Sequence, residues 1–370
     1  MKYGIVLTLL CLFLSNSLLA QRKKESEDSP YKEGIVYALP RSVVRIVVEA
    51  EKESFFHGPY YKFADQLLGL NNAPSEDQVK WELTDFEIET HSEVDPNAYF
   101  MAVGKKAAMV SLSSQGILLG VNVTAVNQVA EYSSPVRTFI EGDSIPDIIF
   151  PDRSMHSFIK GVDSVGIKIP LTLEEKAIEA AHDITKIRKR LFKTLAAGYE
   201  QLHPDGLAYQ IMVNELKALE NEYVALFMGK SFKQRYRFVY EYTPKDKSVK
   251  GEVIFRFSSE KGVVPSTDLS ARPIVLEILK DNSLAGIQAA IASKFENPYA
   301  GSSGIYYRLP GSGKIRLMSS GNLLADKRAV LPQFGTIAAF PEIYLGGDYS
   351  IELHPSTGAI KNISLKDQKK

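Results

Sequence analysis

The sequence predicts an α+β protein that is mostly β, with an N-terminal β-rich domain at residues 31–170, an antiparallel helical hairpin at 171–230 and a C-terminal β-sandwich at 231–366. Three observations predict this class. Val, Ile and aromatic residues alternate with polar ones in short runs near both ends of the chain, as they do in strands. Between these regions, apolar residues recur every three or four positions, as they do in helices. Gly and Pro separate the later runs as turns. We detect no internal repeat.

The first 20 residues, MKYGIVLTLLCLFLSNSLLA, predict a cleaved signal peptide. Lys2 precedes an apolar run, polar residues follow, and Ala20 is the small residue after which we expect cleavage. Ser15 interrupts the run before it reaches the roughly 20 apolar residues of a membrane anchor. We therefore expect a periplasmic or secreted protein with no transmembrane segment after cleavage. The single cysteine, Cys11, lies in this segment, so the mature chain would have no disulfide and no thiol nucleophile.

Residues 21–30 are mostly charged or polar, which predicts a flexible tether. The next segment, GIVYALPRSVVRIVVEAE, predicts a long strand that bends at Pro40. One face of this strand would carry Val44, Ile46 and Val48. GPYYKFADQLLGL predicts a short helix that begins at Pro59 and ends at Gly69. Further strands are predicted at 79–90, 98–103, 107–113 and 117–124.

Two helices are predicted next. Thr172 and Glu175 form the capping-box pattern Thr-x-x-Glu that begins the first helix, and Gly198 ends it. Asp205 caps the second helix, which ends at Gly229. The two apolar stripes are Ile178, Ala181, Ile184, Ile187, Leu191 and Leu195 in the first helix and Ile211, Leu216, Leu219, Tyr223 and Leu226 in the second. A short turn between the helices predicts an antiparallel hairpin.

From residue 232 onward, nine short strand-like runs alternate with turn residues. The runs are FKQRYRFVYEY, GEVIFRF, PIVLEIL, GIYYRLP, KIRLMSS, LLADKRAVL, GTIAAF, YSIEL and AIKNISL. Turns are expected at Gly311, Gly313, Gly321 and the PSTG run, among others. Many short strands with regular turns predict a sandwich of the jelly-roll kind.

The charge pattern does not indicate a nucleic-acid partner. Lys and Arg number 44, and so do Asp and Glu, so no excess of positive charge would attract a polyanion. The basic run KIRKR at 186–190 is interpreted as the solvated face of the first helix. Its counterparts on the second helix would be Glu215, Glu220 and Glu222.

The triplet Gly229-Lys230-Ser231 matches the end of a phosphate-binding loop, which raises the question of a nucleotide. That motif needs Gly at the first of its eight positions, where Val224 stands. A phosphate loop also follows a strand and opens a helix, whereas a helix precedes this triplet. We therefore interpret Gly229 as a helix stop and expect no nucleotide.

No strong catalytic signature is present. There is no Gly-x-Ser-x-Gly motif, and GSSG at 301–304 is one residue short of it. His91, Glu93 and Asp95 alternate and would share one face of a strand, as metal ligands do, but Pro96 favours a strand that runs into a solvated turn. A pair of carboxylates for glycoside hydrolysis stays open, because the two acids can lie anywhere in a chain. We expect no catalytic residue, cofactor or metal.

The run GIYYRLP provides the candidate contact residues. In a strand, Tyr306 and Arg308 face one side, and Ile305, Tyr307 and Leu309 face the other. An aromatic ring beside a planar cation suits contact with a ligand or partner. It suits a cross-strand stack as well, and the stack is favoured. We keep Tyr306 and Arg308 as candidate contacts with a ligand or partner.

Segments along nearly the whole mature chain resemble the secreted bacterial proteins catalogued as domain of unknown function 4831. In the family's order, the matching pieces are YALPRSVVRIVVEAEK, GPYYKFADQLLGL, PDGLAYQIMVNELKALENEYVALFMGK, FSSEKGVVPSTDLSARPIVLEI, GIYYRLP, PQFGTIAAFP and HPSTGAIKNI. The resemblance implies an exported module of Gram-negative bacteria and brings no known activity. It therefore supplies no catalytic residues. It also implies that the Gly-Lys-Ser triplet belongs to the family's LFxGK helix ending.

Together these features predict an exported, non-catalytic cell-envelope protein that binds or scaffolds another protein of the envelope through its hairpin or its sheet edges. Two alternatives stay open. A glycan-binding module would display tyrosines such as Tyr306 on a flat face. A hydrolase acting on envelope polysaccharide or peptide would place two acids about 5–10 Å apart in a cleft.

Overall fold

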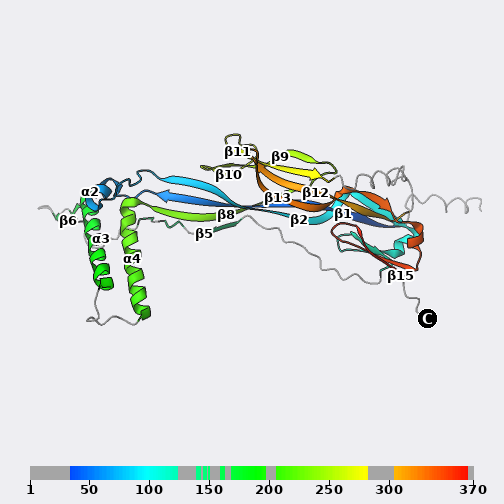
Figure 1. Ribbon diagram of the computed structural model, residues 1–370, viewed down its shortest axis with the longest axis horizontal. Coiled ribbons are helices and arrows are strands. Elements are labelled where there is room, and N and C mark those ends of the chain that lie inside the picture. The colour runs from blue at the N-terminus through cyan, green and yellow to red at the C-terminus, as the bar shows by residue number, and fades with distance from the viewer. Residues whose placement is uncertain are drawn as a thin grey trace, which may run out of the picture.

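The computed structural model describes residues 34–123, 139–142, 145–147, 149–150, 159–162, 168–196, 206–281 and 304–365. The predicted signal peptide at 1–20 and tether at 21–30 lie outside these residues. The described part is elongated, with a pair of long helices projecting from one end (Figure 1). Strands make up most of it, so the predicted mostly-β α+β class is confirmed. No helix within the described ranges has both the length and the apolar character needed to cross a membrane.

A long antiparallel ribbon runs along the molecule and forms the first sheet. Its strands, in spatial order, are β2 (Gln78–Val103), β1 (Gly34–Phe56), β8 (Lys230–Tyr242) and β5 (Phe139–Gly142). β1 pairs with β2 on one edge and with β8 on the other, which satisfies its backbone polar groups while its Val-rich faces are buried. Since β8 follows the helices in the chain, this sheet joins the segments 31–170 and 231–366, which we expected to form separate domains.

The second sheet packs over the middle of the first (Figure 1). In spatial order it contains β10 (Gly262–Val264), β9 (Val249–Ser258), β11 (Arg272–Lys280), β12 (Tyr306–Ser319) and β13 (Asn322–Ala339). The core between the sheets includes Val44, Ile46 and Val48, so their predicted shared face is confirmed. The second sheet contributes Phe255, Ile274, Leu276, Ile315 and Phe334, among others. The sandwich therefore forms between early and late strands, because each sheet needs the other to cover its apolar face.

A third sheet closes the end of the molecule away from the long helices (Figure 1). Its spatial order is β15 (Ile360–Leu365), β14 (Tyr349–Leu353), β4 (Leu118–Val121) and β3 (Val110–Leu112). Two 3-10 helices precede its hairpins, η2 (Gly104–Met109) and η4 (Glu342–Leu345). A second core, which includes Tyr37, Leu39, Leu118 and Ile351, lies here. β6 (Ile159–Val162) and β7 (Lys168–Pro170) form a separate two-stranded sheet.

The opposite end carries η1 (Tyr61–Phe63), α2 (Ala64–Leu68), α3 (Leu173–Ala196) and α4 (Gly206–Met228). The predicted capping box is confirmed: the Glu175 N–H donates to Thr172 Oγ1 at 3.2 Å, and the Thr172 N–H donates to Glu175 Oε2 at 3.0 Å. Gly229 ends α4 with φ of 91°, and Gly69 ends α2 with φ of 64°, as predicted. Arg188 pairs with Glu220 at 2.6 Å across the two long helices.

The inward face of the hairpin differs from the predicted stripes. It is built from Ala177, Ala180, Ala181, Ile184, Val213 and Phe227, which are all buried. Ala181 and Ile184 of the predicted stripes are among them, whereas Ile178, Leu195 and Ile211 are 49%, 54% and 54% exposed. Small alanines let the root of α3 approach Tyr60 and Ala64 closely. Leu195 and Ile211 lie towards the free end, where each helix has little besides the other to cover it.

Several predicted turns lie inside continuous strands. The predicted strands 79–90 and 98–103 are parts of one strand, β2, in which Pro96 and Asn97 lie exposed within a bulge at residues 95–98. β12 likewise unites GIYYRLP with KIRLMSS, and β13 unites LLADKRAVL with GTIAAF. These turn predictions are wrong because the glycines serve close backbone contacts instead. A Cβ on Gly335 would overlap the Leu309 carbonyl oxygen, and one on Gly311 would lie 2.6 Å from the Phe334 carbonyl carbon.

The strand registers reveal an internal repeat that the sequence reading missed. GIVYALPRS at 34–42 and GIYYRLPGS at 304–312 are identical at six of nine positions. In both two-stranded ribbons, β1–β2 and β12–β13, one residue of the first strand faces four residues of the second. Leu39 faces residues 95–98 of β2, and Pro310 faces residues 332–335 of β13. η2 follows the first ribbon and η4 follows the second.

A hairpin completes each repeat, β3–β4 in the first and β14–β15 in the second. The two hairpins attach to their ribbons in the same way. The Ala38 N–H donates to the Gly116 carbonyl at 2.9 Å, and the Arg308 N–H donates to the Gly358 carbonyl at 3.0 Å. The expectation of no internal repeat is therefore wrong: β1–β4 and β12–β15 are two copies of one unit. A long insertion between β1 and β2, which includes α2, obscures the likeness in the sequence.

Candidate functional site: a polar cleft between two bulges

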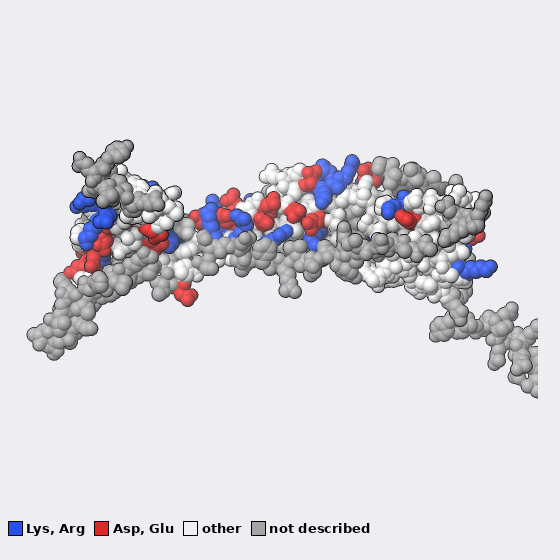
Figure 2. Space-filling view, turned by 90° about the horizontal axis from the view of Figure 1, so that it is seen from below, with Lys and Arg blue, Asp and Glu red and all other residues white. Residues whose placement is uncertain are grey.

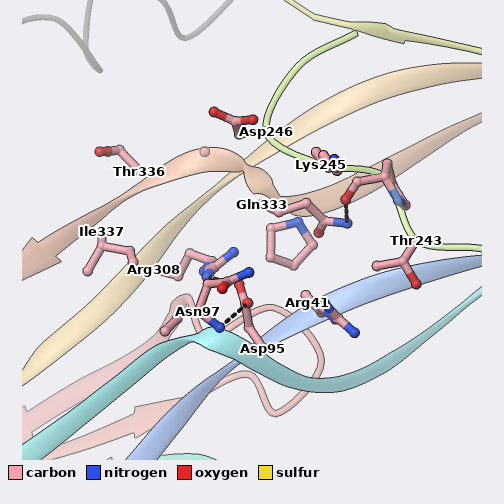
Figure 3. A pocket seen from close by; sticks show the side chains of 14 residues that line it. Arg41, Asp95, Asn97, Thr243, Lys245, Asp246, Arg308, Gln333, Thr336 and Ile337 are labelled. Carbon is pink, nitrogen blue, oxygen red and sulfur yellow. Dashed lines mark hydrogen bonds and ion pairs between the residues drawn. The ribbon is translucent and has the colours of Figure 1, made fainter. Parts of the chain in front are cut away.

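A cleft of about 540 Å³ opens where the two repeats meet, within the size range of ligand-binding pockets. Figure 3 shows the side chains that line it, which come from β1, β2, β12, β13 and the segment that follows β8. The polar ones used below are Arg41, Asp95, Asn97, Arg308, Gln333 and Thr336, together with Lys245 and Asp246. The cleft is therefore built by residues from both copies of the repeat.

The two bulges supply much of its lining, residues 95–98 from β2 and 332–335 from β13. Four residues facing one cannot all pair in the ladder, so the longer strand bends outward and releases side chains from the sheet. Pro96 and Pro332 suit this arrangement because proline has no N–H to offer a ladder. The Asn97 N–H instead donates to Asp95 Oδ1 at 3.0 Å, which closes the first bulge as an Asx turn.

Gln333 ties the second bulge to the first repeat. Its Oε1 accepts the Ser42 N–H at 3.0 Å. Its Nε2 donates to the Ser42 carbonyl at 2.7 Å and to the Pro244 carbonyl at 3.2 Å. One side chain thereby holds the segment after β8, Ser42 of β1 and the bulge of β13 in a fixed relation, which preorganises this wall of the cleft.

The corresponding side chain of the first bulge crosses in the opposite direction. Tyr37 pairs with Phe100, and its counterpart Tyr307 pairs with Ala338. Asp95 precedes Phe100 by as many residues as Gln333 precedes Ala338, so Gln333 is the counterpart of Asp95. Gln333 reaches from the second repeat to the first, whereas Asp95 reaches from the first repeat to Arg308 in the second. Two reciprocal contacts thus join the repeats across the cleft.

Arg308 and Asp95 form the floor of the cleft. Arg308 Nη2 lies 2.7 Å from Asp95 Oδ2, and the two side chains are only 5% and 10% exposed. Charges buried to this extent need a partner, because an isolated buried charge loses its hydration and gains no other interaction. Within the described residues, Asp95 is the one hydrogen-bonding partner of the Arg308 guanidinium, and its Nε is buried with none. A guanidinium has five N–H donors, so most of them have no partner among the described residues.

The mouth of the cleft carries charges of both signs. Arg41 lies at one side, where its Nη2 is 2.6 Å from Glu93 Oε1. Lys245 and Asp246 are exposed and lie across the cleft from Asp95 in Figure 3. The site therefore offers cationic, anionic and neutral polar groups to a ligand within a small space.

Tyr306 is buried beside Arg308. Its ring stacks on Phe100 of β2, a strand of the other sheet, with centroids 4.7 Å apart. The Tyr306 N–H donates to Tyr37 Oη at 2.7 Å. Burial raises the pKa of Tyr37 far above its ordinary value, which keeps this hydroxyl neutral. Of the two candidate contact residues, Arg308 lines the cleft and Tyr306 lies behind it. Contact with a ligand stays a prediction for both.

The alternating acids and histidine of β2 go to three different partners. His91 Nε2 lies 3.9 Å from Glu241, Glu93 pairs with Arg41, and Asp95 pairs with Arg308. Across the described ranges, no three His, Cys, Asp or Glu side chains lie close enough together to hold a metal ion.

Sequence reasoning did not identify Arg41, Asn97, Gln333 and Thr336 as members of a site. They are surface-type residues with no spacing that marks a chemistry. Two signals could have found the region. One is the repeated pattern Gly-Ile-x-Tyr-x-Leu-Pro-x-Ser, and the other is a proline inside a strand-like run in each copy, Pro96 and Pro332.

Charge over the rest of the described surface is mixed. On the face shown in Figure 2, basic and acidic side chains alternate over the middle of the molecule. Within the first sheet, side chains of opposite charge pair across neighbouring strands, with Lys233 Nζ 2.7 Å from Glu51 and Arg45 Nη2 2.9 Å from Glu241. Opposite charges facing each other across strands stabilise the sheet modestly.

Comparison with known proteins gives one match. The model of a family described as domain of unknown function (DUF4831) matches residues 33–361. No curated protein and no solved structure gives a significant match to the chain.

Proposed function

The chain belongs to the DUF4831 family, and from this premise we propose that it is an exported, non-catalytic protein of the cell envelope that binds another envelope protein through the polar cleft. The family description names no activity, so the proposal rests on the chain's own features. The signal peptide predicted at residues 1–20, with cleavage after Ala20, supports export to the periplasm or beyond.

The observation that carries the proposal is the Arg308 guanidinium at the floor of the cleft. A buried arginine whose Nε has no partner among the described residues is costly to a folded protein unless something else occupies that donor. The cleft above it provides about 540 Å³ of space. A preformed pocket with a few converging polar groups is the usual form of a binding site.

The state of Asp95 supports binding over catalysis. A hydrolase with two carboxylates needs one of them to deliver a proton. Asp95 instead accepts from Arg308 through Oδ2 and from the Asn97 N–H through Oδ1, so both of its oxygens are already engaged. The other acid lining the cleft, Asp246, lies at the exposed mouth.

The lining favours a protein partner over a glycan. None of the described residues that line the cleft is aromatic, whereas sugar sites commonly stack their ligand on an aromatic face. Tyr306, which a glycan-binding module would display, is only 4% exposed. Guanidinium, carboxylate, amide and hydroxyl groups are the partners that a polypeptide's own polar groups need.

The helical hairpin supports a scaffolding role for the same protein. Phe192, Leu195, Leu207 and Ile211 are 71%, 54%, 72% and 54% exposed, and all four lie towards its free end. Exposed apolar groups gathered in one place are typical of protein contact surfaces. From Arg41 at the cleft to Phe56 at the foot of the hairpin, β1 extends roughly 50 Å at the usual rise of a strand. The chain therefore presents two separate contact regions at fixed distance.

Site-specific photocrosslinking in intact cells tests the proposal. A photoreactive amino acid is placed at Thr336, which lines the cleft, and in a matched strain at Lys261, which is exposed in the turn between β9 and β10 and does not line the cleft. We expect one defined envelope protein to be crosslinked from position 336 and not from position 261. No crosslink from position 336, or the same set of products from both positions, would count against a specific site in the cleft.

A further inference from the structure

We infer that the cleft recognises a carboxylate carried by a peptide segment of its partner, with Arg308 as the group that binds it. This deepens the proposed function and rests on it. The Arg308 guanidinium makes one hydrogen bond within the described residues, from Nη2 to Asp95, and its Nε is buried without a partner there. Its side chain lines the cleft while being 95% shielded from solvent, so its free donors are directed by the fold and not by its own flexibility.

The position of Arg308 is fixed before any ligand arrives. Its N–H donates to the Gly358 carbonyl at 3.0 Å, and a Cβ on Gly358 would lie 3.3 Å from Arg308 Cβ and 3.0 Å from Pro40 Cδ. Gly358 has φ of 69°, a conformation that suits glycine, so the backbone there can pack against the arginine. A side chain held in this way loses little entropy on binding.

The internal repeat shows that the fold does not need this ion pair. The counterpart of Arg308 in the first repeat is Ala38, and the counterpart of Asp95 in the second is Gln333. Ala38 donates its N–H to Gly116 just as Arg308 does to Gly358, so the same architecture forms with a methyl side chain at that position. A buried guanidinium that the architecture does not require is better explained by an added role, which its position in the cleft makes one of binding.

A carboxylate is the group that best matches the unused donors. Planar guanidinium and planar carboxylate form charge-assisted hydrogen bonds, often two in parallel. Arg41 is a weaker candidate, because its Nε and Nη2 already contact Glu93. The neutral groups Asn97 and Thr336 lie in the same cleft and could hold the amide groups that accompany a carboxylate in a peptide.

Binding of small model peptides to the purified mature chain tests the inference by calorimetry. The probes are N-acetyl-trialanine with a free carboxylate, the same peptide as its C-terminal amide, N-acetylglutamate α-amide, which has only a side-chain carboxylate, and glucuronic acid. We expect at least one peptide carboxylate to bind at millimolar or lower concentration and the amide to bind at least tenfold more weakly. The two carboxylate probes distinguish a chain terminus from an acidic side chain.

Arg308→Lys is the main variant, because lysine can still pair with Asp95 but cannot present the planar fork. We expect a tenfold or greater loss of peptide affinity with an unchanged circular dichroism spectrum. Arg328→Ala, which removes an exposed cation on β13 outside the cleft, is the matched control and should bind as the wild type does. Equal binding of acid and amide, stronger binding of glucuronic acid, full affinity in Arg308→Lys, or no binding of any probe would overturn the inference. If position 336 gives a specific crosslink and any of these results is also obtained, the proposed function stands and only the inference of a carboxylate ligand is refuted.

Discussion

Arg308 Nη2 lies 2.7 Å from Asp95 Oδ2, an ion pair between side chains 5% and 10% exposed that joins the second repeat to the first. Removing one partner leaves the other buried and unpaired. We expect Asp95→Ala to lower the free energy of unfolding by about 3–5 kcal/mol. Replacing both, with Asp95→Leu and Arg308→Met, should cost much less, because no charge is then buried. Urea denaturation measures both variants.

An exposed ion pair of similar length provides the control for that prediction. Lys314 Nζ lies 2.6 Å from Asp326 Oδ2, with side chains 43% and 39% exposed. Asp326→Ala should change the free energy of unfolding far less than Asp95→Ala does, because solvent screens the exposed pair. If Asp95→Ala and Asp326→Ala lower the free energy of unfolding by similar amounts, burial does not strengthen the contribution of the cleft pair to stability.

Gly335 shapes the second bulge by close contact and not by an unusual backbone angle. A Cβ there would overlap the Leu309 carbonyl oxygen, and backbone atoms have no rotamer with which to move aside. We expect Gly335→Ala to destabilise the fold by at least about 2 kcal/mol, towards the upper range of overpacking. Gly347→Ala is the control, since a Cβ there meets nothing within 4 Å, and it should stay within about 0.5 kcal/mol. Thermal unfolding of the two variants measures both effects, and equal losses of stability would contradict the prediction.

Gly229 links the last helix to β8 under two constraints. Its φ is 91°, and a Cβ would lie 2.5 Å from the Phe56 carbonyl oxygen. Gly69 ends α2 with φ of 64° but has no atom within 4 Å of such a Cβ. We expect Gly69→Ala to cost about 1 kcal/mol for the left-handed conformation alone. Gly229→Ala should cost about 1–3 kcal/mol more, because overpacking is added. Equal losses in chemical denaturation would mean that the helix–strand junction is looser than described.

Tyr240 predicts a loss of stability in alkali. Its ring stacks on Phe255 at 4.9 Å, and burial raises its pKa from 10.0 to about 12. Above pH 10 the unfolded chain gives up this proton while the folded chain keeps it, so stability falls as pH rises towards 12. Tyr240→Phe removes this effect. We expect the variant to gain about 1 kcal/mol on the wild type between pH 7 and pH 11, allowing for partial solvent screening. A constant difference across that range, in urea titrations at each pH, would refute the assignment.

Local elements of the fold could be predicted from the sequence where a few neighbouring residues decide them. Thr172 with Glu175 and the lone Gly229 were sufficient, because capping and left-handed helix ends depend on one or two side chains. Gly311 and Gly313 misled, because a glycine that makes a turn and a glycine that admits a distant group look the same in sequence. Which role applies depends on Phe334 and Leu279, which reach these glycines only after the strands have paired.

The cleft was harder to predict than the fold. Arg308 was recognised as a candidate, but its burial was not, since the side chain is covered by residues far away in the chain. Asp95 looked like part of an alternating acidic strand entering solvent, because its partner lies 213 positions later. A bulge is set by the register of two strands, and register is a property of the pair and not of either sequence alone. For the same reason the repeat became evident only once both ribbons could be laid side by side.

The unbroken course of β1 has a mechanical consequence. This single strand runs from the cleft region to the foot of the helical hairpin and is bonded laterally to β2 and β8 for much of that distance. A pull on the hairpin relative to the cleft would act parallel to the strands, in shear, so many lateral bonds would have to give way together and not one after another. Tension applied between the two ends of the molecule would therefore be transmitted along it with little stretching, as by a stiff strut.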